Sequence, residues 1–193
     1  MKRLTHSLLF LAILLILFLP KVASSNVFFQ WSFNIDNMTD NVEKFNYGTM
    51  NNYLFLGIAV TPTKQFIFGQ NVVIWNRTHK IDSGETSQMS LTEMGPKCLL
   101  YFTEERTMGI SFAYHPYTKG TRKVSDGESE KISGTSMLGS VVFHFRITKN
   151  FFMGASLNYH STSIAESTVD EETETVSHTY ATYYPALEFV LRW

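Results

Sequence analysis

Residues 27–36 read Val-Phe-Phe-Gln-Trp-Ser-Phe-Asn-Ile-Asp, and this stretch decides the fold class. Every odd position holds an apolar side chain, whereas four of the five even positions hold a polar one. Successive side chains of a β-strand point to opposite faces, so this alternation predicts a strand with one apolar and one polar face. Few stretches of the chain show helical periodicity, and the same two-residue period returns along most of it.

Seven further runs share this period, and the connections between the eight predicted strands alternate in length. Four connections are long (37–48, 79–88, 117–135 and 161–177), and three are short (61–65, 103–107 and 148–150). Tight turns at one end of a sheet and long loops at the other are typical of a transmembrane β-barrel. We therefore predict an all-β, eight-stranded, antiparallel up-and-down transmembrane barrel, whose even strand number returns both chain ends to the turn side. The further runs are 49–60, 66–78, 89–102, 108–116, 136–147, 151–160 and 178–193.

The polarity of the two faces supports a barrel in lipid. In the last run Leu187, Phe189 and Leu191 share one face, while Glu188 and Arg192 share the other. Most other runs likewise set an apolar face against one that mixes small residues with charges, although both faces of 66–78 are mixed. A water-soluble barrel would place its polar face outside.

Composition excludes several classes of protein. The chain has 193 residues, of which 44% are hydrophobic and 17% charged, and its formal net charge is −1. A disordered chain needs lower hydrophobicity and higher net charge, and a nucleic-acid binder that works through bulk charge needs a basic surface. The single cysteine, Cys98, cannot form an internal disulfide or a cysteine metal knuckle. We expect no cofactor, no metal and no nucleic acid.

The N-terminus has the pattern of a secretory signal peptide. Lys2 and Arg3 precede an unbroken apolar run of 12 residues, 8–19, which is too short to span a membrane as a helix. Small residues follow at 22–25, so cleavage is expected after Ser24 or Ser25. We predict a signal peptide over residues 1–24 and a barrel domain over 25–193, with an uncleaved anchor as the alternative. No later run is long and apolar enough for a membrane helix.

Three prolines oppose the prediction of a closed barrel, because proline removes a ladder hydrogen bond and a closed barrel has no edge strand. Pro116 and Pro185 fit near the rim of the barrel. Pro96 falls inside a predicted strand, so we expect a β-bulge there.

The chain ends in Leu-Glu-Phe-Val-Leu-Arg-Trp, residues 187–193. Alternating apolar residues that run to a C-terminal aromatic resemble the sorting signal of bacterial outer-membrane barrels. With eight strands and a first strand just after the cleavage site, the chain resembles the small OmpX/Ail-type outer-membrane proteins. The resemblance implies location in the bacterial outer membrane, contact with its lipid and lipopolysaccharide, and insertion by the barrel-assembly machinery. The implied assembly signal is Leu187, Phe189, Leu191 and Trp193.

The inward face carries charges that we expect to pair across the lumen, because unpaired buried charges are costly. The expected pairs are Glu188 with Arg192 or Arg146, and Glu93 with Lys97. Such a network closes the lumen, which eight strands make just wide enough for side chains. This favours a structural or surface-interaction role without catalysis, with loops 117–135 and 161–177 available to an extracellular partner. The predicted lumen network is Glu93, Lys97, His144, Arg146, Glu188 and Arg192.

Alternative functions remain open at this point. An OmpW-like conduit for small apolar molecules needs an apolar lumen, and a secreted lipocalin-type barrel also has eight strands. A lipid A-modifying hydrolase is a weaker alternative, suggested by His160 with its neighbours 161–163 and by Glu174. The basic residues of 117–135 suit contact with lipopolysaccharide phosphates, and the acidic residues of 161–177 suit divalent cations or a basic partner. Solvation of the loops is the commoner explanation of both charge runs.

Overall fold

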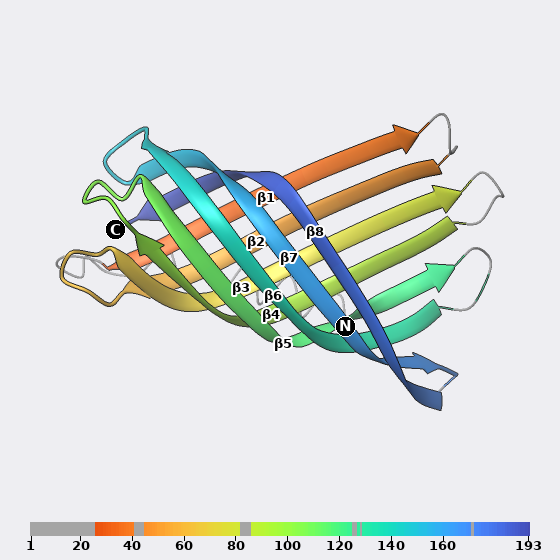
Figure 1. Cartoon of the computed structure of the whole chain (residues 1–193). Coiled ribbons are helices and arrows are strands. Elements are labelled where there is room, and N and C mark those ends of the chain that lie inside the picture. Colours follow the sequence, from red (N-terminus) through yellow and green to blue (C-terminus); the bar gives the residue numbers. More distant parts are fainter. Residues whose placement is uncertain (1–25, 41–44, 82–85, 125–126, 128, 171) are drawn as a thin grey trace, which may run out of the picture.

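The computed structural model describes residues 26–40, 45–81, 86–124, 127, 129–170 and 172–193. Within them the chain forms eight antiparallel strands in one closed barrel (Figure 1), which confirms the predicted architecture. Each strand pairs with the next in sequence, and β8 returns to β1. The predicted signal peptide, residues 1–24, lies outside the described residues and stays a prediction. The strands are β1 (Val27–Asp40), β2 (Phe45–Ala59), β3 (Phe66–Ile81), β4 (Thr86–Tyr101), β5 (Met108–Val124), β6 (Ser129–Arg146), β7 (Phe151–Val169) and β8 (Glu172–Arg192).

The three short connections lie together at one end of the barrel, which we call the turn end (Figure 1). The Lys64 amide donates to the Thr61 carbonyl at 2.9 Å, and the Arg106 amide donates to the Thr103 carbonyl at 3.0 Å. Trp193 donates its backbone N–H to the Val27 carbonyl at 3.0 Å. The first and last strands therefore meet at the turn end, as an even number of strands requires.

The outside of the barrel is apolar and the inside is largely polar. Buried and exposed residues alternate strictly along β4 from Gln88 to Lys97, and β5 and β6 show the same alternation over most of their membrane-facing part. Large apolar side chains point outward, with Phe145 68% and Tyr183 74% exposed. Charged and amide side chains such as Gln30, Glu93 and Arg192 are instead buried inside. This polarity is the inverse of that in a water-soluble barrel and suits hydrocarbon outside the wall.

The strands are longer than the alternation predicted. The segments expected as loops at 117–135 and 161–177 are mostly strand, because β5 and β6 extend to Val124 and from Ser129, and β7 and β8 extend to Val169 and from Glu172. These extensions are rich in Thr, Ser, Lys and Glu, so they lack the apolar alternation that marks a half-buried strand. Backbone ladders hold them instead, as in the pairing of Thr121 with Lys131.

Two of the three prolines lie beside one bulge, whose extra residue belongs to β5 in the ladders with both β4 and β6. The β4–β5 register shifts between Met94 and Lys97, around Pro96, which confirms the expected bulge. Pro116 lies within β5, not at a rim, and the β5–β6 register shifts there as well, between His115 and Thr118. A Cβ atom on Gly95 would stand 1.9 Å from the Tyr114 carbonyl oxygen, so the backbones of β4 and β5 approach too closely here for any other residue.

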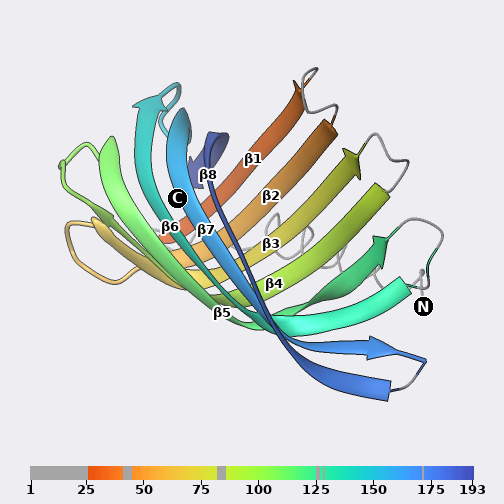
Figure 2. The same cartoon turned by 45° about the vertical axis from the view of Figure 1, so that its right-hand side comes forward.

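The barrel is closed by a short seam between β1 and β8. This ladder has six residue pairs, from Phe28–Arg192 to Phe33–Leu187, whereas each of the other ladders has at least 13. Beyond it β1 and β8 diverge toward their outer ends, as both views show (Figures 1 and 2).

Pro185 lies inside β8, not near a rim as expected, at the point where the seam ends. The Trp193 amide donates to β1 and the Arg192 amide to the carbonyl of Asn150, so odd-numbered residues of β8 direct their backbone groups toward β1. The N–H that Pro185 lacks would therefore have faced β1. The Asn34 side-chain amide donates to the Pro185 carbonyl instead, at 2.7 Å.

Candidate functional site

Seven buried or partly buried side chains form a continuous hydrogen-bonded path from the middle of the lumen to the turn end, which we call the turn-side network. The Lys97 ammonium donates to the Gln30 amide oxygen at 3.3 Å, and the path continues through Ser32 to the Glu188 carboxylate, which accepts from Ser32 at 3.2 Å. His144 Nε2 lies 2.5 Å from the other oxygen of Glu188. The network consists of Lys97, Gln30, Ser32, Glu188, His144, Tyr101 and Arg192.

The contacts at the far end of this network select one tautomer of a neutral His144 ring. Arg192 Nη2 donates to the Tyr101 hydroxyl at 2.7 Å, and that hydroxyl lies 2.8 Å from His144 Nδ1. The Tyr101 hydroxyl donates to Nδ1, so the proton of a neutral His144 ring lies on Nε2 and is donated to Glu188. Arg192 also lies over the Phe152 ring, with its guanidinium carbon 3.8 Å from the ring centroid.

A second group, the central network, surrounds Glu93 farther from the turn end. The carboxylate is fully buried and accepts from Ser136 at 2.5 Å, from Thr162 at 2.9 Å and from His160 at 2.8 Å. His115 donates from Nδ1 to the oxygen of Ser136 at 2.8 Å.

The Asn71 amide nitrogen lies 2.9 Å from His115 Nε2 and donates to it. A neutral His115 ring then donates from Nδ1 and accepts at Nε2. The central network is thus Asn71, His115, Ser136, Glu93, His160 and Thr162, supplied by five different strands.

Five of the six side chains predicted for the lumen network lie inside the barrel: Glu93, Lys97, His144, Glu188 and Arg192. Arg146 does not join them; it is exposed at the turn end, where its Nε donates to the Thr148 carbonyl at 3.2 Å. Its position is the last in β6, so its long side chain reaches the turn and the solvent beyond it.

The pairing also differs from the expected pairs. Glu188 contacts His144 and Ser32 rather than an arginine, and Glu93 contacts His160 rather than Lys97. Strand alternation gives the direction in which a side chain points, whereas its partner depends on the stagger of strands across the lumen. The sequence does not single out Tyr101, Asn71 or Ser136, and it points to Thr162 only as a hydrolase candidate. Their inward parity was the available signal.

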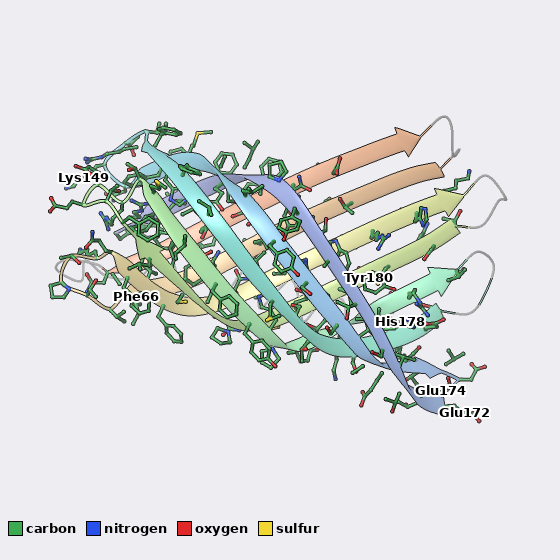
Figure 3. The ribbon with its side chains drawn as sticks, viewed as in Figure 1. Phe66, Lys149, Glu172, Glu174, His178 and Tyr180 are labelled. Carbon is green, nitrogen blue, oxygen red and sulfur yellow. The ribbon has the colours of Figure 1, made fainter. Side chains whose placement is uncertain are left out.

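The residues considered for a hydrolase do not assemble into a catalytic group. His160 is buried against Glu93 and Thr162, and its ring meets the Trp75 ring edge-on, with centroids 5.6 Å apart. Glu174 lies exposed near the outer tip of β8 (Figure 3). Of the neighbouring hydroxyls, Thr162 donates to Glu93 at 2.9 Å, and the exposed Ser163 hydroxyl lies 3.4 Å from that of Thr179. Cys98 lies on the outer face, with its Sγ 3.5 Å from the Phe112 carbonyl oxygen.

Apolar side chains fill the lumen on both sides of the polar networks. At the turn end Phe28, Phe55 and Phe152 belong to a turn-side apolar cluster, and Lys97 lies 5.0 Å from the centre of the Phe55 ring. Toward the outer end lies a second group, the outer apolar cluster, which consists of Tyr53, Val73, Trp75, Met89, Leu91, Ala113, Ile132, Leu138, Ile164 and Tyr184.

Three polar atoms of the outer apolar cluster have no hydrogen-bond partner among the residues that the structure describes. They are the hydroxyls of Tyr53 and Tyr184 and Nε1 of Trp75, each on a residue at least 95% buried. The Tyr53 and Tyr184 rings stack with centroids 6.0 Å apart and so connect β2 with β8 behind the end of the seam. Buried polar groups without partners carry a free-energy cost, which a small molecule with hydroxyl or carbonyl groups would relieve.

The predicted assembly signal lies on the outer face of β8. Leu187 is more than half exposed, and Phe189 stacks against Trp31 and Phe151, with ring centroids 5.5 and 6.3 Å apart. Leu191 pairs with Phe29 of β1, and Trp193 closes the ladder. These side chains therefore form part of an aromatic group across β1, β7 and β8 near the turn end.

Over the part of the chain that the structure describes, no group of three or more His, Cys, Asp or Glu side chains is placed to hold a metal ion. No helix within the described ranges is long and apolar enough to cross a membrane.

Comparison with known proteins gives little. No protein-family model matches the sequence, and no curated protein matches it. Among solved structures the chain is similar to "OmpT (in-vitro folded), an outer membrane protein Vibrio cholerae (trimer form)", with a TM-score of 0.27 and 9% sequence identity. The match covers 90% of this chain and 53% of that one, so the chain spans about half the length of that protein. A similarity at this level carries no argument about function.

Proposed function

We propose that the protein is a small bacterial outer-membrane barrel with a closed lumen, which serves envelope structure or presents its outer hairpins to an external partner, without catalysis. The two lumen networks carry this proposal. Glu93, Lys97 and Glu188 are each at most 3% exposed inside a barrel whose outer wall is apolar. Charges buried in this way need partners, and the partners fill the cross-section that a pore would use.

The outer-membrane location and the finer OmpX/Ail-type assignment belong to the same proposal. Support comes from the apolar outer wall, the eight strands and the alternating aromatic C-terminus. Cell fractionation with heat-modifiable electrophoresis tests the location. Recovery of the protein in the periplasm or the medium would contradict it and favour a secreted barrel.

Single-channel recording of the refolded protein in planar bilayers tests the closed lumen. We expect no stable conductance steps from the wild-type protein. The double variant Glu93→Ala/Lys97→Ala removes side chains from both networks and is expected to show small steps. The matched control Thr92→Ala/Pro96→Ala changes outward-facing neighbours on the same strand and should stay silent. Reproducible steps from the wild type would refute closure.

A second function, a conduit for small apolar molecules, is favoured by the outer apolar cluster and the short seam beside it. In this function an apolar molecule enters between β1 and β8 above Asn34 and Pro185 and displaces the Tyr53–Tyr184 stack. Binding of an environment-sensitive apolar dye to the refolded protein tests it. Tyr184→Phe removes an unpartnered hydroxyl while keeping the ring, and Trp75→Phe removes the unpartnered Nε1 while keeping an aromatic side chain, so both should change the preference for hydroxylated over plain probes. Equal preference in all variants would contradict this function.

A further inference from the structure

Three lysines share the outer face of β5 and β6 beyond the apolar part of the wall. Lys119 and Lys123 lie on β5 and Lys131 on β6, and all three side chains are exposed. Lys131 pairs with Thr121 in the β5–β6 ladder, and Thr121 lies midway between the two lysines of β5. Diagonal neighbours on one face of a sheet lie about 7–8 Å apart, so the three ammonium groups can serve one ligand.

The position of these lysines along the membrane normal can be worked out from the outward-facing residues of β5. Large apolar or aromatic side chains point outward from Met108 to Tyr117. At a rise of about 3.3 Å per residue and a tilt of about 40°, each residue climbs about 2.5 Å along the membrane normal, so this stretch covers roughly 23 Å. An apolar band of about 25 Å is typical of such barrels. Lys119 then stands about 5 Å above the band, at the level of lipid headgroups, and Lys123 about 15 Å above it, from where its long side chain can extend back toward them.

The lowest of the three lysines is held against the aromatic border of the band. The Lys119 ammonium lies 5.4 Å from the centre of the Tyr117 ring, within the range of a cation–π contact. Tyr114, five residues before Lys119 on β5, also points outward. The lysines therefore lie above two exposed tyrosines, Tyr114 and Tyr117. This places the positive charge at the outer interface rather than in the solvent far above it.

No carboxylate of the described residues neutralises these lysines. Glu130 faces the lumen, where it pairs with Arg122 at 2.8 Å and accepts from Ser167 at 3.1 Å. Glu166 faces outward on β7, and its carboxylate accepts from Ser133 at 2.8 Å. Within the described ranges no Asp or Glu oxygen lies within 4.0 Å of the three ammonium groups. The acidic residues Glu172 and Glu174 lie at the tip of the β7–β8 hairpin (Figure 3).

We propose that Lys119, Lys123 and Lys131 form a binding site for the phosphate groups of lipid A in the outer leaflet. Lys119 and Lys123 are four residues apart, a span of about 13 Å along the strand. The group offers three cations, and lipid A carries two phosphates, whereas a lipid such as phosphatidylglycerol carries one. The inference rests on the proposed outer-membrane location, and it adds the sector of the wall and the chemistry that bind the lipid.

A titration of the refolded, full-length mature protein in detergent with purified bisphosphorylated lipid A tests the site. We expect Lys119→Gln/Lys123→Gln/Lys131→Gln to weaken binding by about tenfold to a hundredfold, since each lysine contributes to attraction of an anionic lipid. The matched control Lys64→Gln/Arg146→Gln/Lys149→Gln removes three charges at the turn end and should bind as the wild type does. Equal affinity of the two triple variants, or no binding by the wild type, would overturn the proposal.

Two further arms identify the source of the phosphate. Dephosphorylated lipid A should bind at least tenfold more weakly to the wild type, and phosphatidylglycerol should bind no better than that. Phosphatidylglycerol binding equal to that of lipid A would overturn the assignment to lipid A. Retention of the heat-modifiable form shows that the triple variant folds, and the single variant Lys123→Gln, which is farthest from the apolar band, provides the same comparison if it does not. Fractionation of the wild type tests the outer-membrane location separately, since the titration requires no membrane targeting.

Discussion

Replacing Glu188 with glutamine changes the charge of the turn-side network while keeping the size of the side chain. The network contains one carboxylate, Glu188, and two side chains that carry positive charge, Lys97 and Arg192. The carboxylate is 2% exposed, accepts hydrogen bonds from Ser32 and His144, and interacts electrostatically with Lys97. In Glu188→Gln two buried cations remain without a compensating charge.

We expect Glu188→Gln to lower the free energy of unfolding by about 3–5 kcal/mol, the usual cost of leaving buried charge uncompensated. The matched control is Glu174→Gln, the same chemical change on the same strand at an exposed position, which should stay within about 0.5 kcal/mol of the wild type. The assay is guanidinium unfolding of the barrel in lipid vesicles, followed by tryptophan fluorescence. Lys97→Met added to Glu188→Gln should recover part of the loss, because it removes one uncompensated cation. Equal stability of the two glutamine variants would refute the reasoning.

Three further outcomes are expected. Deleting Trp193 should reduce the heat-modifiable form in outer membranes, because it removes the terminal aromatic and the ladder bond to Val27; unchanged assembly would contradict the assembly signal. Oxidation should cross-link Asn34→Cys/Ala186→Cys, which continue the register of Phe33 and Leu187, but not Asp36→Cys/Tyr184→Cys, where the strands diverge; efficient cross-linking of the second pair on a reducing versus non-reducing gel would show that the seam closes. Depth-dependent quenching should place Trp31 and Trp193 near one membrane interface, and a bilayer-centre position for Trp193 would disagree with the turn-end aromatic group.

The fold could be predicted because side chains in the wall of a membrane barrel alternate between an apolar outer face and a polar inner face, which gives the sequence a period of two. Each half-buried strand segment alternates, as in 27–36, and the short turns punctuate it. The outer extensions could not be delimited in the same way. From Thr118 to Val124 neither face meets lipid or a large apolar core, so the backbone ladder alone makes the strand.

The candidate site was predictable in its direction but not in its contacts. Parity alone turns Glu93, Lys97 and Glu188 inward. Their partners come from strands that are distant in sequence; His160 of β7, for example, contacts Glu93 of β4. The stagger of the strands sets these contacts, and the local sequence does not show that stagger. Arg146 shows the limit of parity, since a long side chain at a strand end turns to the solvent instead of the lumen.

The prolines argue against a closed barrel when only the sequence is considered, yet each of them marks a place where the structure lacks a ladder hydrogen bond. A proline in a closed barrel must lie where a ladder bond is already missing. Pro96 and Pro116 meet this condition at one bulge, whose extra residue lies on β5 in the ladders with both β4 and β6, so a single irregularity accommodates both prolines. Pro185 meets it differently, because its missing N–H faces β1 at the residue where the β1–β8 ladder has ended. Restoring that donor with Pro185→Ala would let the backbone of β8 offer a further bond to Ile35. The β1–β8 seam is therefore short partly because its sequence denies it the next hydrogen bond, and the Asn34 side chain takes up the carbonyl that remains.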